Sequence, residues 1–152
     1  MEKVKERESI KNQEGIKNIG IVGSRTMDER YKAKVKAVTE DILDRGYRIA
    51  TGGAIGVDQY CIESLISLGL SDSGTIYSPW QNFYGFPIKV RKVTREYRNF
   101  GGSIIWGPAS GKEDASFIRL ALLKRNERLI EACSGLIAFI NQTSRGSLFS
   151  IT

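Results

Sequence analysis

Two glycine-rich segments in the first half of the chain carry residue types that bind phosphate groups. The first is Gly23-Ser24-Arg25, and the second is the run Thr-Gly-Gly-Ala-Ile-Gly-Val-Asp at residues 51–58. Glycine lets backbone N–H groups approach an anion closely, and a following helix start adds a positive dipole end. Ser24 adds a hydroxyl donor, and the Arg25 guanidinium can grip a phosphate with two hydrogen bonds. The segments predict a phosphate pocket; the alternative is an ordinary tight turn with Arg25 in solvent.

The second segment places an acid close to its glycines. Gly52, Gly53 and Gly56 open the backbone, and Asp58 lies near the start of the next expected helix. Asp58 either hydrogen-bonds a ribose or acts as a base, or it simply caps its helix. The segment is not a Walker A motif, because no Gly-Lys-Ser/Thr follows, and it does not match the G-x-G-x-x-G fingerprint.

The composition excludes several kinds of catalytic and metal site. This chain has no histidine, and its two cysteines do not form a CxxC pair. His-ligated zinc, Ser-His-Asp triads and Cys-His dyads are therefore excluded. We expect no metal and no cofactor. Both cysteines fall in expected helices and are interpreted as small buried side chains of a reducing compartment, which predicts a cytoplasmic protein.

The glycine segments follow short apolar runs, residues 19–22 and 47–50, that are typical of strands buried on both faces. Apolar residues at helical spacing predict helices over residues 28–45 and 57–68, and a third strand is expected at 74–77. This alternation predicts an α/β fold: a doubly wound, mostly parallel, Rossmann-like sheet with helices on both faces. Ligands in such sheets bind at the carboxyl ends of the strands, where the glycine segments lie.

The second half of the chain is less regular. We expect an irregular insertion at residues 79–111 with one strand at 103–106, then a helix at 113–132, a strand at 136–140 and a polar loop. Aromatic residues alternate with lysine and arginine between residues 80 and 100; they either stack bases or belong to the core. Residues 1–17 are predicted to be a flexible charged arm, and residues 18–152 a single domain.

The net charge of +6 favours a polyanionic partner, although a solvated basic face explains it equally well. No apolar run approaches the roughly 20 residues that span a bilayer, so we expect no membrane segment. A homo-oligomer is consistent with the many aromatic side chains of so small a domain.

Four segments together resemble one family. They are Ile-Val-Gly-Ser-Arg at 21–25, Gly-Gly-Ala-x-Gly-x-Asp at 52–58, Arg125-Asn126, and a small-residue turn at 144–147; their order and spacing are similar to those of the superfamily of DNA-processing protein A (DprA/Smf) and lonely-guy (LOG) domains. Tyr-Ser-Pro-Trp at 77–80 also resembles the small stand-alone DprA-like members. The resemblance implies a Rossmann-like domain whose pocket receives a nucleotide or a nucleic-acid phosphate. It places these residues at that pocket: Gly23, Ser24, Arg25, Gly52, Gly53, Gly56, Asp58, Arg125, Asn126, Gly146 and Ser147.

The sequence departs from the hydrolase branch of this superfamily. That branch is marked by Pro-Gly-Gly-x-Gly-Thr-x-x-Glu, whereas residues 144–152 read Ser-Arg-Gly-Ser-Leu-Phe-Ser-Ile-Thr, without the glutamate. We therefore expect a non-catalytic domain that binds a nucleotide or single-stranded nucleic acid. Two alternatives stay open: a LOG-type nucleoside 5′-monophosphate N-glycosidase (phosphoribohydrolase), with Asp58 or Glu127 as its carboxylate, and a scaffold that senses a nucleotide for a partner protein.

Arg125 and Asn126 raise a geometric question. In one helix over residues 113–132 they fall mid-helix, about 18 Å from its start. They are expected to line the pocket only if that helix bends or restarts near Lys124; otherwise they are surface residues.

Overall fold

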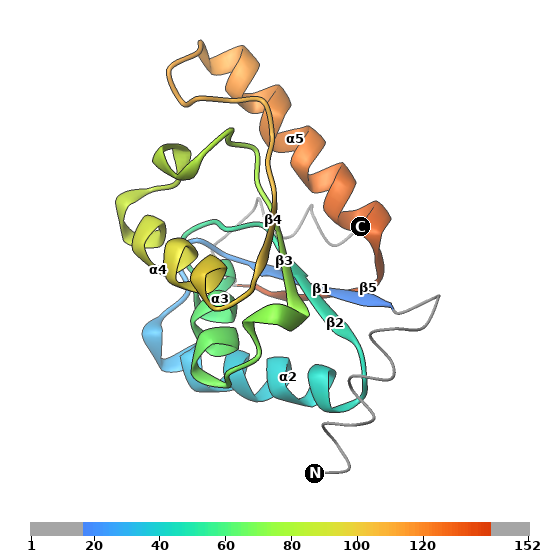
Figure 1. Cartoon of the computed structure of the whole chain (residues 1–152). Helices are drawn as coiled ribbons and strands as arrows, with labels where there is room; N and C mark the ends of the chain where they lie inside the picture. Colours follow the sequence, from blue (N-terminus) through green and yellow to red (C-terminus); the bar gives the residue numbers. More distant parts are fainter. Residues whose placement is uncertain (1–16, 141–152) are drawn as a thin grey trace.

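The structure, a computed structural model, describes residues 17–140. In this part of the chain, five parallel strands form one sheet in the order β4-β3-β2-β1-β5 (Figure 1). The strands are β1 (Asn18–Gly23), β2 (Arg48–Thr51), β3 (Gly74–Tyr77), β4 (Ser103–Ile105) and β5 (Cys133–Phe139). The predicted doubly wound, Rossmann-like α/β fold is confirmed.

Four α-helices connect the strands: α2 (Lys32–Asp44), α3 (Val57–Ser67), α4 (Ile88–Asn99) and α5 (Ala115–Ala132). The chain moves in one direction across the sheet from β1 to β4, and it then returns to place β5 on the other side of β1. Because crossovers between parallel strands are right-handed, this reversal puts α5 on the face opposite α2, α3 and α4 (Figure 1). Three short 3₁₀ turns complete the described elements: η1 (Glu29–Tyr31), η2 (Ser71–Ser73) and η3 (Phe83–Gly85).

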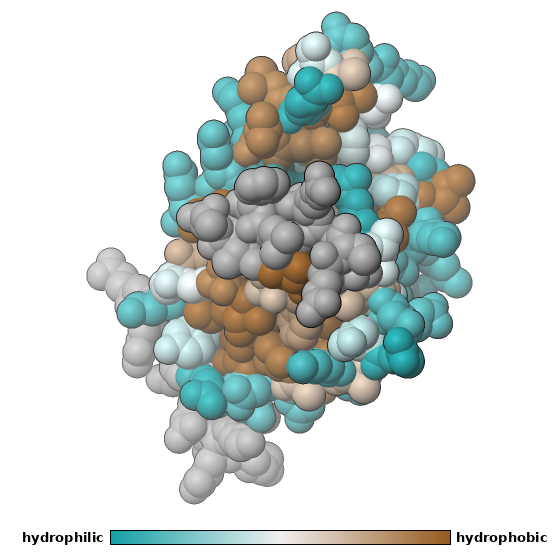
Figure 2. All heavy atoms as spheres, turned by 180° about the vertical axis from the view of Figure 1, so that it is seen from behind, coloured by the Kyte–Doolittle hydropathy of each residue, from teal (hydrophilic) through white to brown (hydrophobic). Residues whose placement is uncertain are grey.

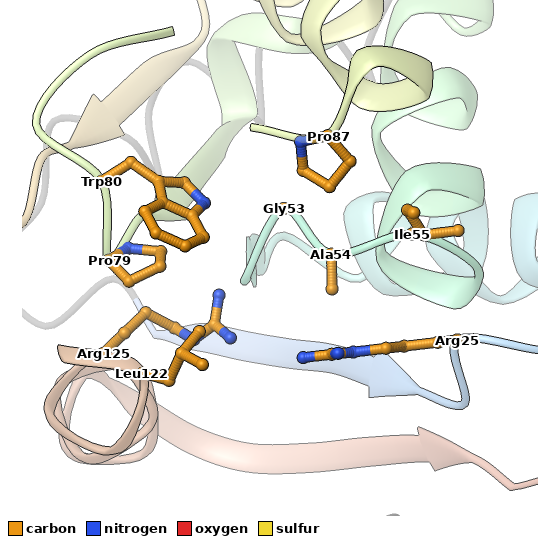
Figure 3. A pocket seen from close by; sticks show the side chains of 9 residues that line it. All are labelled: Arg25, Gly53, Ala54, Ile55, Pro79, Trp80, Pro87, Leu122 and Arg125. Atoms are coloured by element: carbon orange, nitrogen blue, oxygen red, sulfur yellow. The ribbon is translucent and has the colours of Figure 1, made fainter. Parts of the chain in front are cut away.

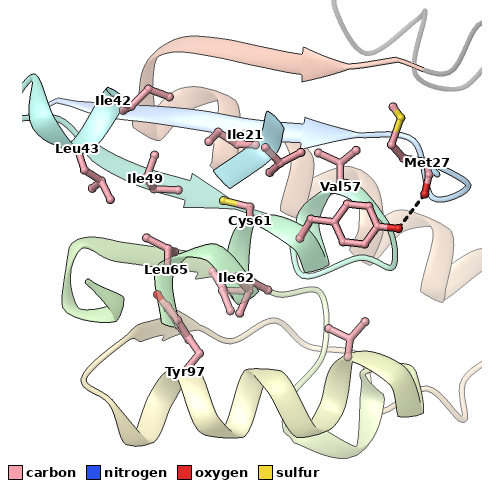
Figure 4. Close-up of a cluster of buried hydrophobic side chains, with 14 of the residues drawn as sticks. Ile21, Met27, Ile42, Leu43, Ile49, Val57, Cys61, Ile62, Leu65 and Tyr97 are labelled. Atoms are coloured by element: carbon pink, nitrogen blue, oxygen red, sulfur yellow. Dashed lines mark hydrogen bonds between the residues drawn. The ribbon is translucent and has the colours of Figure 1, made fainter. Parts of the chain in front are cut away.

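The main hydrophobic core lies between the sheet and the helices α2, α3 and α4 (Figure 4). Its fully buried members include Ile21, Ile49, Leu43, Cys61, Leu65 and Tyr97. The Tyr60 hydroxyl donates to the Met27 carbonyl over 2.8 Å, so α3 is joined to the connection that follows β1. Burial raises the pKa of the Cys61 thiol to about 12, as expected of a small buried side chain. Cys133, in contrast, begins β5 rather than lying in a helix.

Helix α4 was not expected, because residues 79–111 are predicted to be irregular apart from one strand. Its buried face consists of Val90, Thr94 and Tyr97, at helical spacing. With Val93, which also packs against the core, these residues recur at i, i+3, i+4 and i+7, and mostly charged side chains fill the other positions. The amphipathic spacing is present in the sequence, so the expectation of an irregular segment is wrong. The strand expected at 103–106 is confirmed as β4.

The other boundaries moved by a few residues. The helix expected at 28–45 divides into η1 and α2, and β5 begins at Cys133 rather than at residue 136. Within residues 17–140, no helix is both long and apolar enough to cross a membrane.

Candidate phosphate-binding site

A pocket opens at the carboxyl ends of β1, β2 and β3 (Figure 3). Segments that follow three neighbouring strands form most of its wall, and α5 closes it from the other face of the sheet. The lining residues are Arg25, Gly53, Ala54, Ile55, Pro79, Trp80, Pro87, Leu122 and Arg125. This is the edge at which parallel α/β sheets bind ligands. The pocket lies at the sheet edge where the sequence places a phosphate site, and its ligand stays a prediction.

The two glycine segments pack directly against each other through Gly56. This residue has a φ of +91°, and a Cβ atom there would lie 2.3 Å from the Ser24 carbonyl oxygen and 2.8 Å from the Arg25 Cα. The Val57 N–H donates to the same Ser24 oxygen over 3.3 Å. Gly56 is therefore required by a close approach of two backbones, and this contact fixes the position of Arg25.

The first segment differs from its predicted geometry. The Ser24 N–H donates to the Phe139 carbonyl of β5 over 3.0 Å, and a Cβ atom on Gly23 would lie 2.3 Å from that same oxygen. No helix starts directly after Gly23, because α2 begins only at Lys32. The expectation that a helix dipole supports this turn is therefore wrong. Gly23 and Ser24 join the first turn to the sheet and do not line the pocket.

The second segment runs directly into α3, whose N-cap residue is Gly56. Gly53 lines the pocket with a φ of +74°, and a Cβ atom there would lie 2.8 Å from the Phe86 ring. A Cβ atom on Gly52 would lie 2.9 Å from both the Arg125 Nη1 and the Asp58 Oδ2. Gly52 is thus the place where two charged side chains approach the backbone.

Asp58 is buried beneath the second turn, with 5% of its surface exposed. Its Oδ2 accepts a hydrogen bond from the Ala54 N–H over 3.2 Å, whereas its Oδ1 has no hydrogen-bond partner among the described residues. Burial raises the pKa of this carboxyl to about 6, against the opposing attraction of Arg125. Asp58 accepts its hydrogen bond from Ala54, which precedes α3, and the N-cap residue of α3 is Gly56. The interpretation of Asp58 as a helix cap is therefore wrong.

Arg125 is 9% exposed and reaches the second turn from α5. Its Nη1 donates to the Gly52 carbonyl, and its Nε donates to the Asn126 Oδ1 over 2.8 Å. Burial lowers the pKa of its guanidinium; Asp58 opposes this shift, and the positive charge of Arg25 adds to it. Two guanidinium groups therefore face one pocket, and Figure 3 shows the Arg25 side chain extended toward that of Arg125.

Arg125 reaches the pocket without any bend in α5, which is continuous from Ala115 to Ala132. The expectation that the helix must bend or restart near Lys124 is therefore wrong. The helix contacts β1, β2 and β3, and Figure 3 shows the part of it that carries Leu122 and Arg125 at the pocket, so its middle, and not its start, lies at the strand ends. A long arginine side chain then covers the remaining distance.

The other predicted site residues are placed as follows. Asn126 is exposed and accepts the Arg125 Nε–H, so it positions the guanidinium instead of lining the pocket. Glu127 is exposed on α5 and is not a lining residue. Gly146 and Ser147 lie outside the described residues. Between residues 17 and 140, no group of three or more His, Cys, Asp or Glu residues could hold a metal ion.

Six lining residues were not among the predicted site residues: Ala54 and Ile55, which lie within the second glycine segment, and Pro79, Trp80, Pro87 and Leu122 outside it. Outside the glycine segment a signal existed for two residues, because Pro79 and Trp80 follow shortly after the carboxyl end of β3. Leu122 lies three residues before Arg125, on the same side of α5. Pro87 could not be found without α4, whose N-cap it is.

The parallel sheet with helices on both faces defines a Rossmann-like α/β domain, and the pocket lies at the ends of its strands. A family model described as DNA recombination-mediator protein A matches residues 8–152, so the chain belongs to that family. The DprA resemblance seen in the sequence is therefore confirmed. No curated protein matches the chain.

Two solved structures have a similar fold. DNA processing protein A from Helicobacter pylori, described for its single-stranded DNA binding mode, is 20% identical with a TM-score of 0.64; the match covers 89% of this chain and 58% of that one. The Streptococcus pneumoniae protein is 21% identical with a TM-score of 0.65, over 89% of this chain and 45% of that one. The chain thus spans about half the length of these structures.

Proposed function

We propose that this chain binds single-stranded DNA and holds a backbone phosphate between Arg25 and Arg125 at the strand ends. The observation that carries the proposal is the pair of guanidinium groups facing one pocket. Family membership supports it, as does the single-stranded DNA binding ascribed to the Helicobacter pylori relative. We also propose that the protein is cytoplasmic, as the sequence predicts.

The electrostatics of the pocket favour an anion. Burial is the main cause of the lowered pKa of Arg125; Asp58 opposes this shift, and the positive charge of Arg25 adds to it. Two guanidinium groups face a single carboxylate, so the pocket keeps a positive charge. Arg25 is exposed and makes no ion pair with any described residue. A phosphate between the two groups would accept charge-assisted hydrogen bonds from both.

The rest of the pocket wall suits a nucleotide unit. Trp80, Pro79, Pro87 and Leu122 present mainly apolar surface beside the arginines. Aromatic rings stack on bases of any sequence, and this is how many proteins hold single strands without base specificity. We therefore expect binding with little sequence preference.

The test is the affinity of a fluorescent oligothymidylate for the full chain, measured by anisotropy at low and moderate salt. Arg25→Ala should weaken binding about 10- to 100-fold, since hydrogen bonds to a charged group contribute about 1.5–3 kcal/mol. Lys34→Ala removes the same charge from the exposed side of α2 and serves as the matched control. Equal affinities of the two variants would contradict the proposal.

The N-glycosidase alternative receives less support from the geometry. None of the nine residues that line the pocket is a carboxylate, Asp58 is buried beneath the turn, and Glu127 lies elsewhere on α5. Incubation with a panel of nucleoside 5′-monophosphates tests this alternative, and release of free base would revive it. The scaffold alternative requires a surface for a partner protein, and among the described residues the exposed apolar side chains of α5, Leu120, Leu123 and Ile130, suit such a surface.

A further inference from the structure

Helix α4 carries a row of arginine side chains beside the pocket. Arg91, Arg95 and Arg98 are spaced i, i+4 and i+7, so they share one flank of the helix, next to its buried face. We call these residues the arginine stripe. None of the three forms an ion pair with a residue in the described part of the chain. Three guanidinium groups in a row favour an extended polyanion over a single small ligand.

Two aromatic rings of η3 lie against the stripe. The Arg91 and Arg95 guanidinium carbons lie 5.4 and 5.5 Å from the centre of the Tyr84 ring, and Arg95 and Arg98 lie 5.4 and 5.7 Å from that of Phe83. Phe83 also packs edge-on against Trp106 at 5.0 Å and therefore belongs to the core. Tyr84 is 70% exposed. Of the two rings of η3, the structure thus places Phe83 in the core and leaves Tyr84 open to a base.

Arg91 holds this ring in place. Its Nη2 donates to the carbonyls of Tyr84 and Phe86, over 3.0 and 3.2 Å. The loop that carries Tyr84 is therefore fixed against α4 before any ligand arrives. A preorganised ring costs little conformational entropy when a base stacks on it.

The stripe is continuous with the pocket. Pro87 lines the pocket and is the N-cap residue of α4, and the Phe86 ring contacts Gly53 in the second glycine turn. From Arg91 to Arg98 the helix extends about 10 Å, roughly the length of three nucleotides at the 3.4 Å spacing of a stacked strand. A strand that leaves the pocket past Pro87 thus meets Tyr84 and then the arginines.

We infer that the arginine stripe and Tyr84 form a second contact surface for single-stranded DNA, next to the pocket. Arg95 and Arg98 contact successive phosphates, and one base stacks on Tyr84. This inference rests on the proposed function for the class of ligand, but it assigns residues that the pocket does not contain. It predicts that affinity rises with strand length beyond what fills the pocket.

The first experiment compares two lengths of oligothymidylate, about 4 and about 16 nucleotides, the range of site sizes of single-strand binding folds. Arg95→Ala/Arg98→Ala should weaken binding of the long strand at least 10-fold and leave the short strand almost unchanged. The slope of log affinity against log salt for the long strand should fall by about 0.7 for each phosphate that the variant no longer neutralises. Lys34→Ala/Arg45→Ala, at the α2 helix and its C-cap, removes equal charge as the matched control.

The second experiment tests the ring. Tyr84→Ala should weaken binding of the long strand about 5- to 100-fold, the range that alanine substitution of stacking rings gives, whereas Tyr84→Phe should bind normally. A strand containing 5-iodouracil should crosslink to Tyr84 in the unmodified protein. Normal binding of the long strand by Tyr84→Ala, without a crosslink to Tyr84 in the unmodified protein, would overturn the assignment of this ring.

The outcomes separate this inference from the proposed function. If Arg25→Ala abolishes short-strand binding but the α4 variants bind the long strand normally, the pocket stands and the second surface is overturned. If the short strand never binds while the long strand depends on Arg95, Arg98 and Tyr84, the pocket fails and the surface stands. If the Arg95→Ala/Arg98→Ala variant unfolds, the single variant Arg98→Ala replaces it in the test. This variant loses less packing, because the Arg98 guanidinium contacts one ring only.

Discussion

At the scale of single residues, the buried carboxyl group of Asp58 links the site to pH. Burial raises its pKa to about 6 in the folded protein, from 3.8 in an unperturbed side chain. At pH values between these two pKa values, the native state binds more protons than the unfolded chain. The free energy of unfolding therefore falls as pH rises through this window. The total decrease that Asp58 causes is about 3 kcal/mol.

Asp58→Asn should remove this dependence. We expect the free energy of unfolding of the variant, from urea titrations at several pH values between 4 and 6, to vary less with pH than that of the unmodified protein. Asp41→Asn, at an exposed position on α2, is the control that should keep the original slope. Parallel pH profiles for Asp58→Asn and the unmodified protein would show that Asp58 does not titrate in this range.

At the scale of elements, the contact between the two glycine turns should be sensitive to a single methyl group. Gly56 and Gly69 both have positive φ, +91° and +71°, but an added Cβ clashes with the Ser24 and Arg25 backbone only at Gly56 and meets nothing within 4 Å at Gly69. Gly69→Ala should cost about 1–2 kcal/mol, the conformational penalty alone. Gly56→Ala should cost several kcal/mol more, because backbone atoms must move.

Chemical denaturation of both variants measures this difference. Gly56→Ala should also weaken oligonucleotide binding, since the displaced turn carries Arg25, whereas Gly69→Ala should bind normally. Equal free energies of unfolding for the two variants would contradict the packing of turn against turn.

At the scale of the whole molecule, α5 is the sole helix of residues 17–140 on its face of the sheet, and it keeps apolar side chains outside. Leu120, Leu123 and Ile130 are 53–54% exposed, on the side of the helix opposite the buried Ala121 and Leu129. Figure 2 shows apolar surface gathered on the side of the molecule seen from behind. Apolar surface that persists on a folded domain is typical of interaction sites.

The homo-oligomer expected from the sequence stays a prediction. Because of these exposed side chains, we expect the contact between the subunits to lie at α5. Sedimentation velocity at increasing protein concentration should show a shift toward larger species. Leu120→Gln/Leu123→Gln should reduce that shift, and Ile88→Gln, at an exposed apolar residue of α4, should not. A single monomeric species at all concentrations would contradict the prediction.

The sequence by itself predicted the strands, their parallel pairing and the sheet edge at which a pocket lies, but not the strand order β4-β3-β2-β1-β5. Short apolar runs ending in glycine, separated by residues at helical spacing, are local patterns, and local patterns suffice to predict a Rossmann-like sheet. Arg25 was found in this way, because it follows directly after a predicted strand, although the Gly56 contact that fixes its position could not be predicted from the spacing. The family resemblance singled out Arg125, but neither it nor the spacing indicated how that residue reaches the pocket.

Only the tertiary structure decided what the individual residues do there. Gly56 is required by contact with Ser24, 32 positions away, and Asp58 is buried because Arg125 and the second turn cover it. Each of these depends on groups that are distant in the sequence and adjacent in space. Burial and close approach are properties of the folded packing, so no local pattern encodes them.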